Sequence, residues 1–391
     1  MSVSRLEHMA GIGVDRMGNR ADATGDASIL RLENLDTDLR PPPGVEEATG
    51  LAAADDAANS YLPFLGADDL RRAAAARVSS DAGVEYDWNA TTLVSAGGLN
   101  GILNVLLAIL EPGDEVVMLD PIYIGLVNRV RLAGGVPVYA RCDAVDGVWR
   151  LDHDSLREVV GPRTKAFLMM SPAMPSGAVL TADDWRAVCD ACRDADAWMI
   201  HNSAMERILF DGLEPVHPAS LPGMAERTIT VGAVSKEYRM IGWRVGWIVA
   251  PSNADAVRPI VDDIGLVAIS NVVCNVGIAQ RAATVALESP RNDLDAAVAR
   301  WQRRRDVVLE ELAGYPVVAP QGGWSLLVDV AQLGLTGAEA SERLFDKGQV
   351  AATPMDGWGS ERSAGFLRLV YSNEPVDRLR GLRSRFEAAL G

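Results

Sequence analysis

Lys236 and Arg244 lie eight residues apart in a segment, residues 235–246, that reads SKEYRMIGWRVG. A buried lysine amine becomes neutral and nucleophilic, and can form a Schiff base with an aldehyde. The Arg244 guanidinium offers forked donors to phosphate oxygens, while Gly242 and Gly246 let the backbone come close. This spacing suits an aldehyde cofactor that carries a phosphate. The alternative is a surface lysine beside a glycine-containing turn.

Composition narrows the class of protein. The chain has 391 residues, of which 48% are hydrophobic and 23% charged, enough for two domains or one large domain with an appendage. Its formal net charge of −16 argues against binding to nucleic acid or an anionic membrane, because both need basic patches. We see no apolar run long enough for a membrane span and no secretory signal at the start. We therefore expect a globular cytoplasmic enzyme.

The four cysteines include a CxxC pair, Cys189 and Cys192. This pair lies within a helical pattern that has neither a second CxxC nor a nearby histidine. Buried thiols on a helix face are the favoured interpretation, with a metal or redox role as the alternative. The four histidines are scattered without the spacing of metal ligands, so we expect no metal site.

Apolar runs of strand length alternate with amphipathic helical patterns from Val94 onward. The strand candidates are residues 92–95, 115–119, 136–140, 166–170, 197–201 and 228–232. The helix candidates between them are residues 99–110, 123–132 and 183–194. This alternation predicts an α/β fold with a mostly parallel sheet that has helices on both faces.

After Pro251 the pattern changes to a smaller α+β unit. It begins with one long helical stretch over residues 277–313, followed by strands at 324–329 and 366–371. We expect a large domain over residues 51–275 and a small domain formed by residues 28–50 and 276–391. Residues 1–27 show no clear period, so they are expected to form a flexible arm or to pack elsewhere.

The segment around Lys236 resembles the pyridoxal-phosphate lysine motif of class I/II aminotransferases, which have fold type I. This resemblance extends from about Ile29 to the C-terminus and implies a seven-stranded, mostly parallel sheet in the large domain. It implies pyridoxal 5′-phosphate bound by Lys236, with phosphate contacts from Arg244, Ser235 and the helix start at Gly98 and Leu99. Unpaired N–H groups at a helix start suit a phosphate.

Further positions match the family in order along the chain. Tyr123 matches the aromatic residue that stacks on the pyridine ring, and Tyr61 matches a tyrosine that reaches the phosphate of the neighbouring subunit. Arg368 matches the arginine that binds the substrate α-carboxylate through a bidentate fork. Asn34 falls in the N-terminal substrate segment. The resemblance therefore implies a homodimer with a shared active site.

Three positions depart from the family pattern. Asn202 replaces the aspartate that pairs with the pyridine nitrogen, and Met174 and Met205 replace the two partners of the phenolic oxygen. A carboxylate would keep the ring nitrogen protonated, whereas a neutral amide offers no charge for that purpose. We therefore expect a cofactor ring that withdraws electrons less strongly. Ala233 also stands where a phosphate-binding serine is common, and Ser235 can compensate.

Together these features predict transamination between an amino acid and a keto acid. Lys236 would hold the cofactor and move the Cα proton. One alternative is a specialised reaction on the same site, namely elimination, replacement, cyclisation or oxidation of an amino acid. Another is a homologue that binds ligand without turnover. The sequence assigns no residue to the distal group of the substrate.

Overall fold

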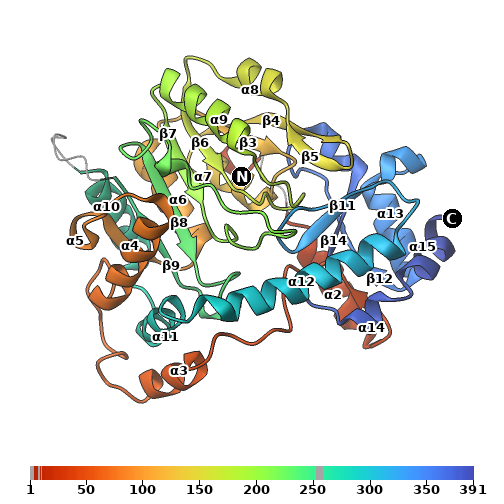
Figure 1. Cartoon of the computed structure of the whole chain (residues 1–391), viewed down its shortest axis with the longest axis horizontal. Coiled ribbons are helices and arrows are strands. Elements are labelled where there is room, and N and C mark those ends of the chain that lie inside the picture. Colours follow the sequence, from red (N-terminus) through yellow and green to blue (C-terminus); the bar gives the residue numbers. More distant parts are fainter. Residues whose placement is uncertain (1–3, 8, 10, 252–258) are drawn as a thin grey trace.

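The computed structural model describes residues 4–7, 9, 11–251 and 259–391 of the chain. An eight-stranded sheet forms the larger part, in the order β2-β9-β8-β7-β6-β3-β4-β5 (Figure 1). Its strands are β2 (Thr92–Ser95), β3 (Glu115–Asp120), β4 (Val136–Val145), β5 (Val148–Leu151), β6 (Thr164–Met169), β7 (Trp198–Asn202), β8 (Thr228–Ala233) and β9 (Gly246–Val249). All of them run parallel except β9 and β5.

Helices cover both faces of this sheet, as the two-sided burial of β2 shows. Leu93 packs in the core that includes Ile102 of α6 (Gly98–Ile109). The next residue, Val94, packs in a second core with Leu70 of α4 (Asp68–Ala82). Because successive side chains of a strand point to opposite faces, α6 and α4 lie on opposite sides of the sheet. Helices α7 (Ile124–Leu132), α8 (His153–Val159), α9 (Ala182–Asp194) and α10 (Ile260–Val272) complete this part of the molecule.

A smaller unit contains a four-stranded antiparallel sheet in the order β10-β11-β14-β13. Its strands are β10 (Val317–Val318), β11 (Ser325–Asp329), β13 (Thr353–Pro354) and β14 (Phe366–Val370). Strand β1 (Leu30–Arg31) pairs in parallel with β12 (Val350–Ala351), so the N-terminal segment reaches this unit. Its helices are α12 (Arg291–Glu311), α13 (Gly337–Arg343), α14 (Val376–Leu379) and α15 (Leu382–Leu390).

Two expectations about these elements were wrong. The large sheet has eight strands, because β5 adds an antiparallel hairpin strand next to β4. The long helical stretch is two helices, α11 (Gly277–Leu287) and α12, which begins directly after Pro290. Proline lacks the N–H that helix continuation needs, and it disfavours helical backbone in the residue before it. The expected domain limits stay a prediction.

The N-terminal residues contain a packed helix, α2 (Val14–Thr24). Met17 and Ala21 lie four residues apart and are buried in a small core with Ile29, Phe345 and Ala351. Of the two alternatives for residues 1–27, packing therefore applies to this helix. A shorter helix, α1 (Ser4–Glu7), precedes it, and α3 (Val45–Ala53) follows before the large sheet.

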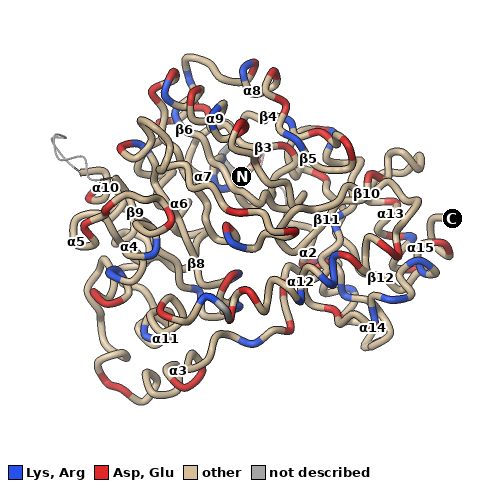
Figure 2. Tube along the Cα trace, viewed as in Figure 1, with Lys and Arg blue, Asp and Glu red and all other residues tan. Residues whose placement is uncertain are grey.

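Cys189 and Cys192 are buried on α9 and form no disulfide, as expected for thiols that fill a helix face. Burial raises the pKa of each thiol to about 12. Lys and Arg are interspersed with Asp and Glu along the chain in the view of Figure 2. None of the described helices combines the length and apolar character that crossing a bilayer requires.

Candidate active site

A cavity of about 700 Å³ lies at the carboxyl edge of the large sheet. The residues that reach it from this edge follow directly after parallel strands, or end them. Gly98 follows β2, Tyr123 follows β3, Met174 follows β6, Asn202 ends β7 and Lys236 follows β8. Open α/β sheets bind ligands at this edge, and the volume is in the usual range for a small-molecule site.

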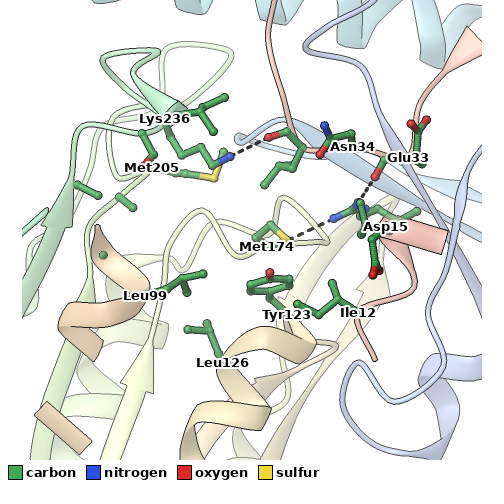
Figure 3. Close-up of a pocket in the computed structure, with 18 of the residues that line it drawn as sticks. Ile12, Asp15, Glu33, Asn34, Leu99, Tyr123, Leu126, Met174, Met205 and Lys236 are labelled. Carbon is green, nitrogen blue, oxygen red and sulfur yellow. Dashed lines mark hydrogen bonds between the residues drawn. The ribbon is translucent and has the colours of Figure 1, made fainter. Parts of the chain in front are cut away.

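Lys236 extends into this cavity, and its Nζ donates a hydrogen bond to the backbone oxygen of Leu35 at 2.8 Å (Figure 3). The same Nζ lies 4.7 Å from the ring centroid of Trp324. Burial lowers the pKa of Lys236 to about 7, against the opposing charge of Asp36, and the positive charge of Arg368 lowers it further. A substantial fraction of this amine is therefore neutral at neutral pH, as a nucleophile or base requires.

Arg244 and two glycines form a close-packed cradle at the start of α6. A Cβ atom on Gly97 would lie 2.5 Å from Nη2 of Arg244, and one on Gly246 would lie 2.8 Å from the backbone nitrogen of Gly98. The Nη1 atom of Arg244 donates to Oγ of Ser235 at 3.1 Å. Glycine therefore permits the guanidinium to meet the N–H groups of the helix start, which is a site suited to a phosphate.

Arg368 enters the cavity from β14 and is almost fully buried. Its Nη2 donates to the backbone oxygen of Glu33 and to Oγ1 of Thr353, the latter at 3.2 Å. Its Nε has no hydrogen-bond partner among the described residues. Burial lowers the pKa of Arg368 to about 10. A buried guanidinium with an unused donor is suited to bind an anion such as a carboxylate.

The remaining predicted contacts divide into two groups. Leu99 and Asn34 line the cavity together with Tyr123, whose ring packs edge-on against Trp358 at 5.3 Å between centroids. Tyr61 does not line the cavity of its own chain, and 83% of its side chain is exposed. Within a single chain, then, the structure brings all the predicted site residues together except Tyr61.

The three atypical residues face the cavity and give it few polar groups. Met205 and Met174 are buried there, and Sδ of Met174 lies 4.0 Å from Nη1 of Arg368. The side-chain amide of Asn202 donates to Sδ of Met170 at 3.5 Å. A thioether is a weak acceptor, so the Asn202 amide is readily available to a ligand.

Sequence reasoning missed several residues in or beside the cavity. Trp324 lies beside the Lys236 amine, although the sequence identifies it only as the start of a strand. Ile12, Asp15 and Asn19 reach the cavity from α2 and from the segment before it. The sequence signal for Trp324 was a tryptophan directly after two glycines, Gly322 and Gly323. No sequence signal pointed to the N-terminal residues.

A buried polar cluster, His201, Glu206 and His217, lies outside the cavity lining. Its candidate ligand atoms all lie within 4.8 Å of one another, because the fold brings together residues that are separate in sequence. The expectation of no metal site stays a prediction. Nε2 of His201 lies 3.1 Å from Oε1 of Glu206. Burial alone would raise the pKa of Glu206, but the charge and hydrogen bond of His201 and the charges of His217 and Arg77 together outweigh it and lower that pKa to about 2. Burial lowers the pKa of His217 to about 4.

Comparison with known proteins agrees with this geometry. Residues 31–385 match the family described as aminotransferase class I and II. The chain is 34% identical to arginine–pyruvate transaminase of Pseudomonas aeruginosa, over 89% of this chain and 87% of the relative. It is 30% identical to an aspartate aminotransferase of Pyrococcus abyssi, over 94% and 93% of the two chains. The solved structure of N-succinyldiaminopimelate aminotransferase from Mycobacterium tuberculosis superposes with a TM-score of 0.90 at 28% identity, over the full length of both chains.

Proposed function

Because the chain belongs to the class I and II aminotransferase family, whose enzymes depend on pyridoxal 5′-phosphate, we propose that Lys236 anchors this cofactor and moves the proton of an α-amino acid. The observation that carries this proposal is the buried amine of Lys236, its pKa lowered to about 7, at the carboxyl edge of the sheet and in one cavity with the unpaired Nε of Arg368.

The residues present fit the cofactor. The cradle of Gly97, Gly246 and Arg244 would hold its phosphate, Tyr123 would lie against its ring, and the Asn202 amide would meet the ring nitrogen. Once bound, the cofactor supplies an aldehyde for the amino group and a ring that accepts electrons from the Cα–H bond. A cavity of about 700 Å³ has room for the cofactor and an amino acid together.

The protein's own groups would then orient the substrate and carry its proton. The forked donors of Arg368 hold the α-carboxylate, which fixes the direction of the Cα–H bond. Near pH 7 the Lys236 amine can take that proton and return it at another carbon, because its lowered pKa suits both roles. The apolar side chains of Met174, Met205 and Leu99 exclude water around the transfer.

A second candidate function rests on the neutral partner at the ring nitrogen. Asn202 cannot stabilise a proton on that nitrogen as a carboxylate does, and Met174 and Met205 offer no strong hydrogen bond to the phenolic oxygen. These residues favour a specialised reaction, such as elimination, replacement, cyclisation or oxidation of an amino acid. Because the fold supports many reactions of this cofactor, residues near the ring decide among them.

The exposed Tyr61 supports a homodimer with a shared active site. An aromatic residue that is 83% exposed, on a segment whose family counterpart crosses to the neighbouring phosphate, would be covered by a second copy of the chain. The reduced, buried thiols of α9 are consistent with a cytoplasmic location. The arginine–pyruvate and aspartate aminotransferases among the relatives limit the substrate to an α-amino acid and a keto acid acceptor.

The test uses the purified chain saturated with pyridoxal 5′-phosphate. Borohydride reduction and mass spectrometry should place the trapped cofactor on Lys236 rather than on Lys165 or Lys347, the other two lysines of the chain. Addition of an amino acid should release the keto acid and leave the cofactor in its amine form. Product without the amine form would support the specialised reaction, and a trapped cofactor with no response to any amino acid would support a binding role without turnover.

A further inference from the structure

Once the proposed roles are assigned, the remaining charged residues of the cavity are mostly acidic. Lys236 is the cofactor anchor, Arg244 faces the phosphate and Arg368 faces the α-carboxylate. Among the described residues of the lining, the remaining cation is Arg31, and the acids are Asp15, Asp22 and Glu33. These groups leave the distal part of the cavity with an excess of negative charge.

Arg31 is already occupied by two carboxylates. Its Nη1 lies 2.6 Å from Oδ1 of Asp22, and its Nη2 lies 2.7 Å from Oε1 of Glu33. Burial alone would lower the pKa of Arg31, but the hydrogen bonds and charges of these two acids outweigh it and raise that pKa. Arg31 is therefore poorly placed to receive a second carboxylate from a substrate.

Asp15 differs from the other two acids because its carboxylate makes no ion pair or hydrogen bond within the described part of the chain. Its helix is held by Met17 and Ala21 on the buried side, and the spacing of Asp15, Asn19 and Asp22 places all three on the opposite face, toward the cavity. Figure 3 shows Asp15 and Ile12 on the side of the cavity opposite Lys236 and Met205.

A second observation, independent of the acidic residues, points to a ligand in this cavity. The almost fully buried Nε of Arg368 lacks a partner within the same cavity. Ile12, Met174 and Leu126 supply apolar side chains to the lining of the same cavity. A ligand in this cavity can therefore contact the cation Arg368, apolar side chains and the unpaired carboxylate of Asp15.

We propose that Asp15 selects amino acids whose side chain is an aliphatic stem ending in a cation, a guanidinium or an ammonium group. This inference rests on the proposed function, because it assumes that Arg368 holds the α-carboxylate. A substrate with a distal carboxylate would face Asp15 and would compete with Asp22 and Glu33 for Arg31. An uncharged side chain would leave the Asp15 carboxylate without a partner but without a penalty, since Asp15 is exposed at the mouth.

The test compares matched pairs of amino acids that differ in the distal charge: L-arginine with L-citrulline, and L-lysine with L-norleucine, with L-glutamate as the anionic member. We expect kcat/KM of the cationic member to exceed that of its neutral partner by about tenfold, mainly through KM. A fully buried hydrogen bond between charged groups would give a larger ratio, but solvent at the mouth of the cavity weakens this one.

Asp15→Asn should remove most of this preference and leave L-norleucine and L-citrulline unchanged. Asp15→Lys should move the preference toward L-glutamate. The matched control is Glu47→Gln, which removes one exposed acid of α3 away from the cavity and should leave every ratio as in the wild type. Increasing ionic strength should raise KM for the cationic members only.

Three outcomes separate the two proposals. If the wild type transaminates L-norleucine or L-glutamate with a kcat/KM equal to that of the cationic members, the selectivity of Asp15 is refuted and the proposed function stands. If Asp15→Asn lowers kcat/KM equally for charged and neutral members, Asp15 supports the helix and does not select the substrate. If no member of the panel reacts, the proposed function itself fails.

Discussion

The two walls of the cavity are built in different ways. The sheet-edge wall consists of the residues that end or follow the parallel strands, with Lys236 and Arg244 at its centre. The N-terminal wall consists of α2, residues 31–35 and Arg368. The first wall is positioned by the backbone, because its loops are fixed by strand ends and by glycines that allow no side chain. The second depends in addition on side chains, because ion pairs and a small apolar core hold α2 beside β1 and β12.

This difference separates two tasks of the site. A wall fixed by backbone geometry keeps the anchoring amine and the phosphate cradle in place whatever the substrate. A wall built from side chains can change its charge pattern by single substitutions without disturbing the sheet. We therefore expect substitutions in the sheet-edge wall to abolish chemistry, and substitutions in the N-terminal wall to change binding.

The largest effect is expected from Lys236→Ala. Loss of the amine removes both the covalent anchor and the proton carrier, so kcat should fall by about 10⁴-fold or more. The visible absorption band of the bound cofactor should also disappear. Lys347→Ala, at an exposed position outside the cavity, is the matched control and should keep both. Retention of the band in Lys236→Ala would contradict the anchoring role.

Arg368→Lys tests the N-terminal wall. Lysine keeps the positive charge but cannot make the forked contact with a carboxylate. We expect kcat/KM for amino acids to fall by about a hundredfold, with most of the change in KM. Amines that lack the α-carboxylate should react as slowly as with the wild type. If KM stays unchanged while kcat falls, Arg368 acts in the chemical step and the comparison of the two walls is wrong.

The contrast between the walls also explains what could be read from the sequence. Lys236, Gly98 and Tyr123 each lie in a short motif that follows a strand, and Arg244 lies just before the next strand, so local sequence contains both the chemistry and the position. The alternation of strands and helices predicted the large sheet for the same reason. The extra strand β5 and the break at Pro290 are local features that this alternation alone does not resolve.

The N-terminal wall depends on contacts between distant parts of the chain. Helix α2 buries only Met17 and Ala21, too few apolar residues for a clear helical period. The residues that fix it, Phe345 and Ala351, lie more than 300 positions away in the sequence. The grouping of His201 with His217 arises in the same way, because neither neighbours the other in sequence. Asp15 could not be assigned before these contacts were known.

Asn202→Asp tests whether the sheet-edge wall limits the reaction through charge. The new carboxylate would favour a proton on the ring nitrogen, so removal of the Cα proton should become about tenfold faster, measured as loss of deuterium from Cα-labelled substrate. Asn89→Asp, an exposed position, serves as the control. An unchanged or slower exchange rate would show that the neutral amide is not the limiting feature.

The same variant has a second expected property. Without cofactor, the carboxylate that Asn202→Asp introduces would be buried, which costs about 1–3 kcal/mol of the free energy of unfolding at pH 8. Burial raises the pKa of such a group, so the cost should shrink as pH falls and the carboxylate is protonated. Denaturant unfolding of the cofactor-free variant at pH 8 and pH 5 measures this difference independently of activity.

The smallest expected effect is the change in the free energy of unfolding with pH that the buried amine of Lys236 causes. The folded pKa of Lys236 is about 7 and its ordinary value is 10.5, so between these values the unfolded chain binds a proton that the folded chain does not. Stability must then rise with pH, by at most about 1.4 kcal/mol for each unit. Lys236→Met lacks this titration. In cofactor-free protein, the free energy of unfolding of the wild type relative to Lys236→Met should rise from pH 7.5 to pH 9.5 and stay level below about pH 6. If the difference between the two proteins does not change over this pH range, burial does not hold the Lys236 amine neutral. The bound cofactor itself would then have to activate Lys236.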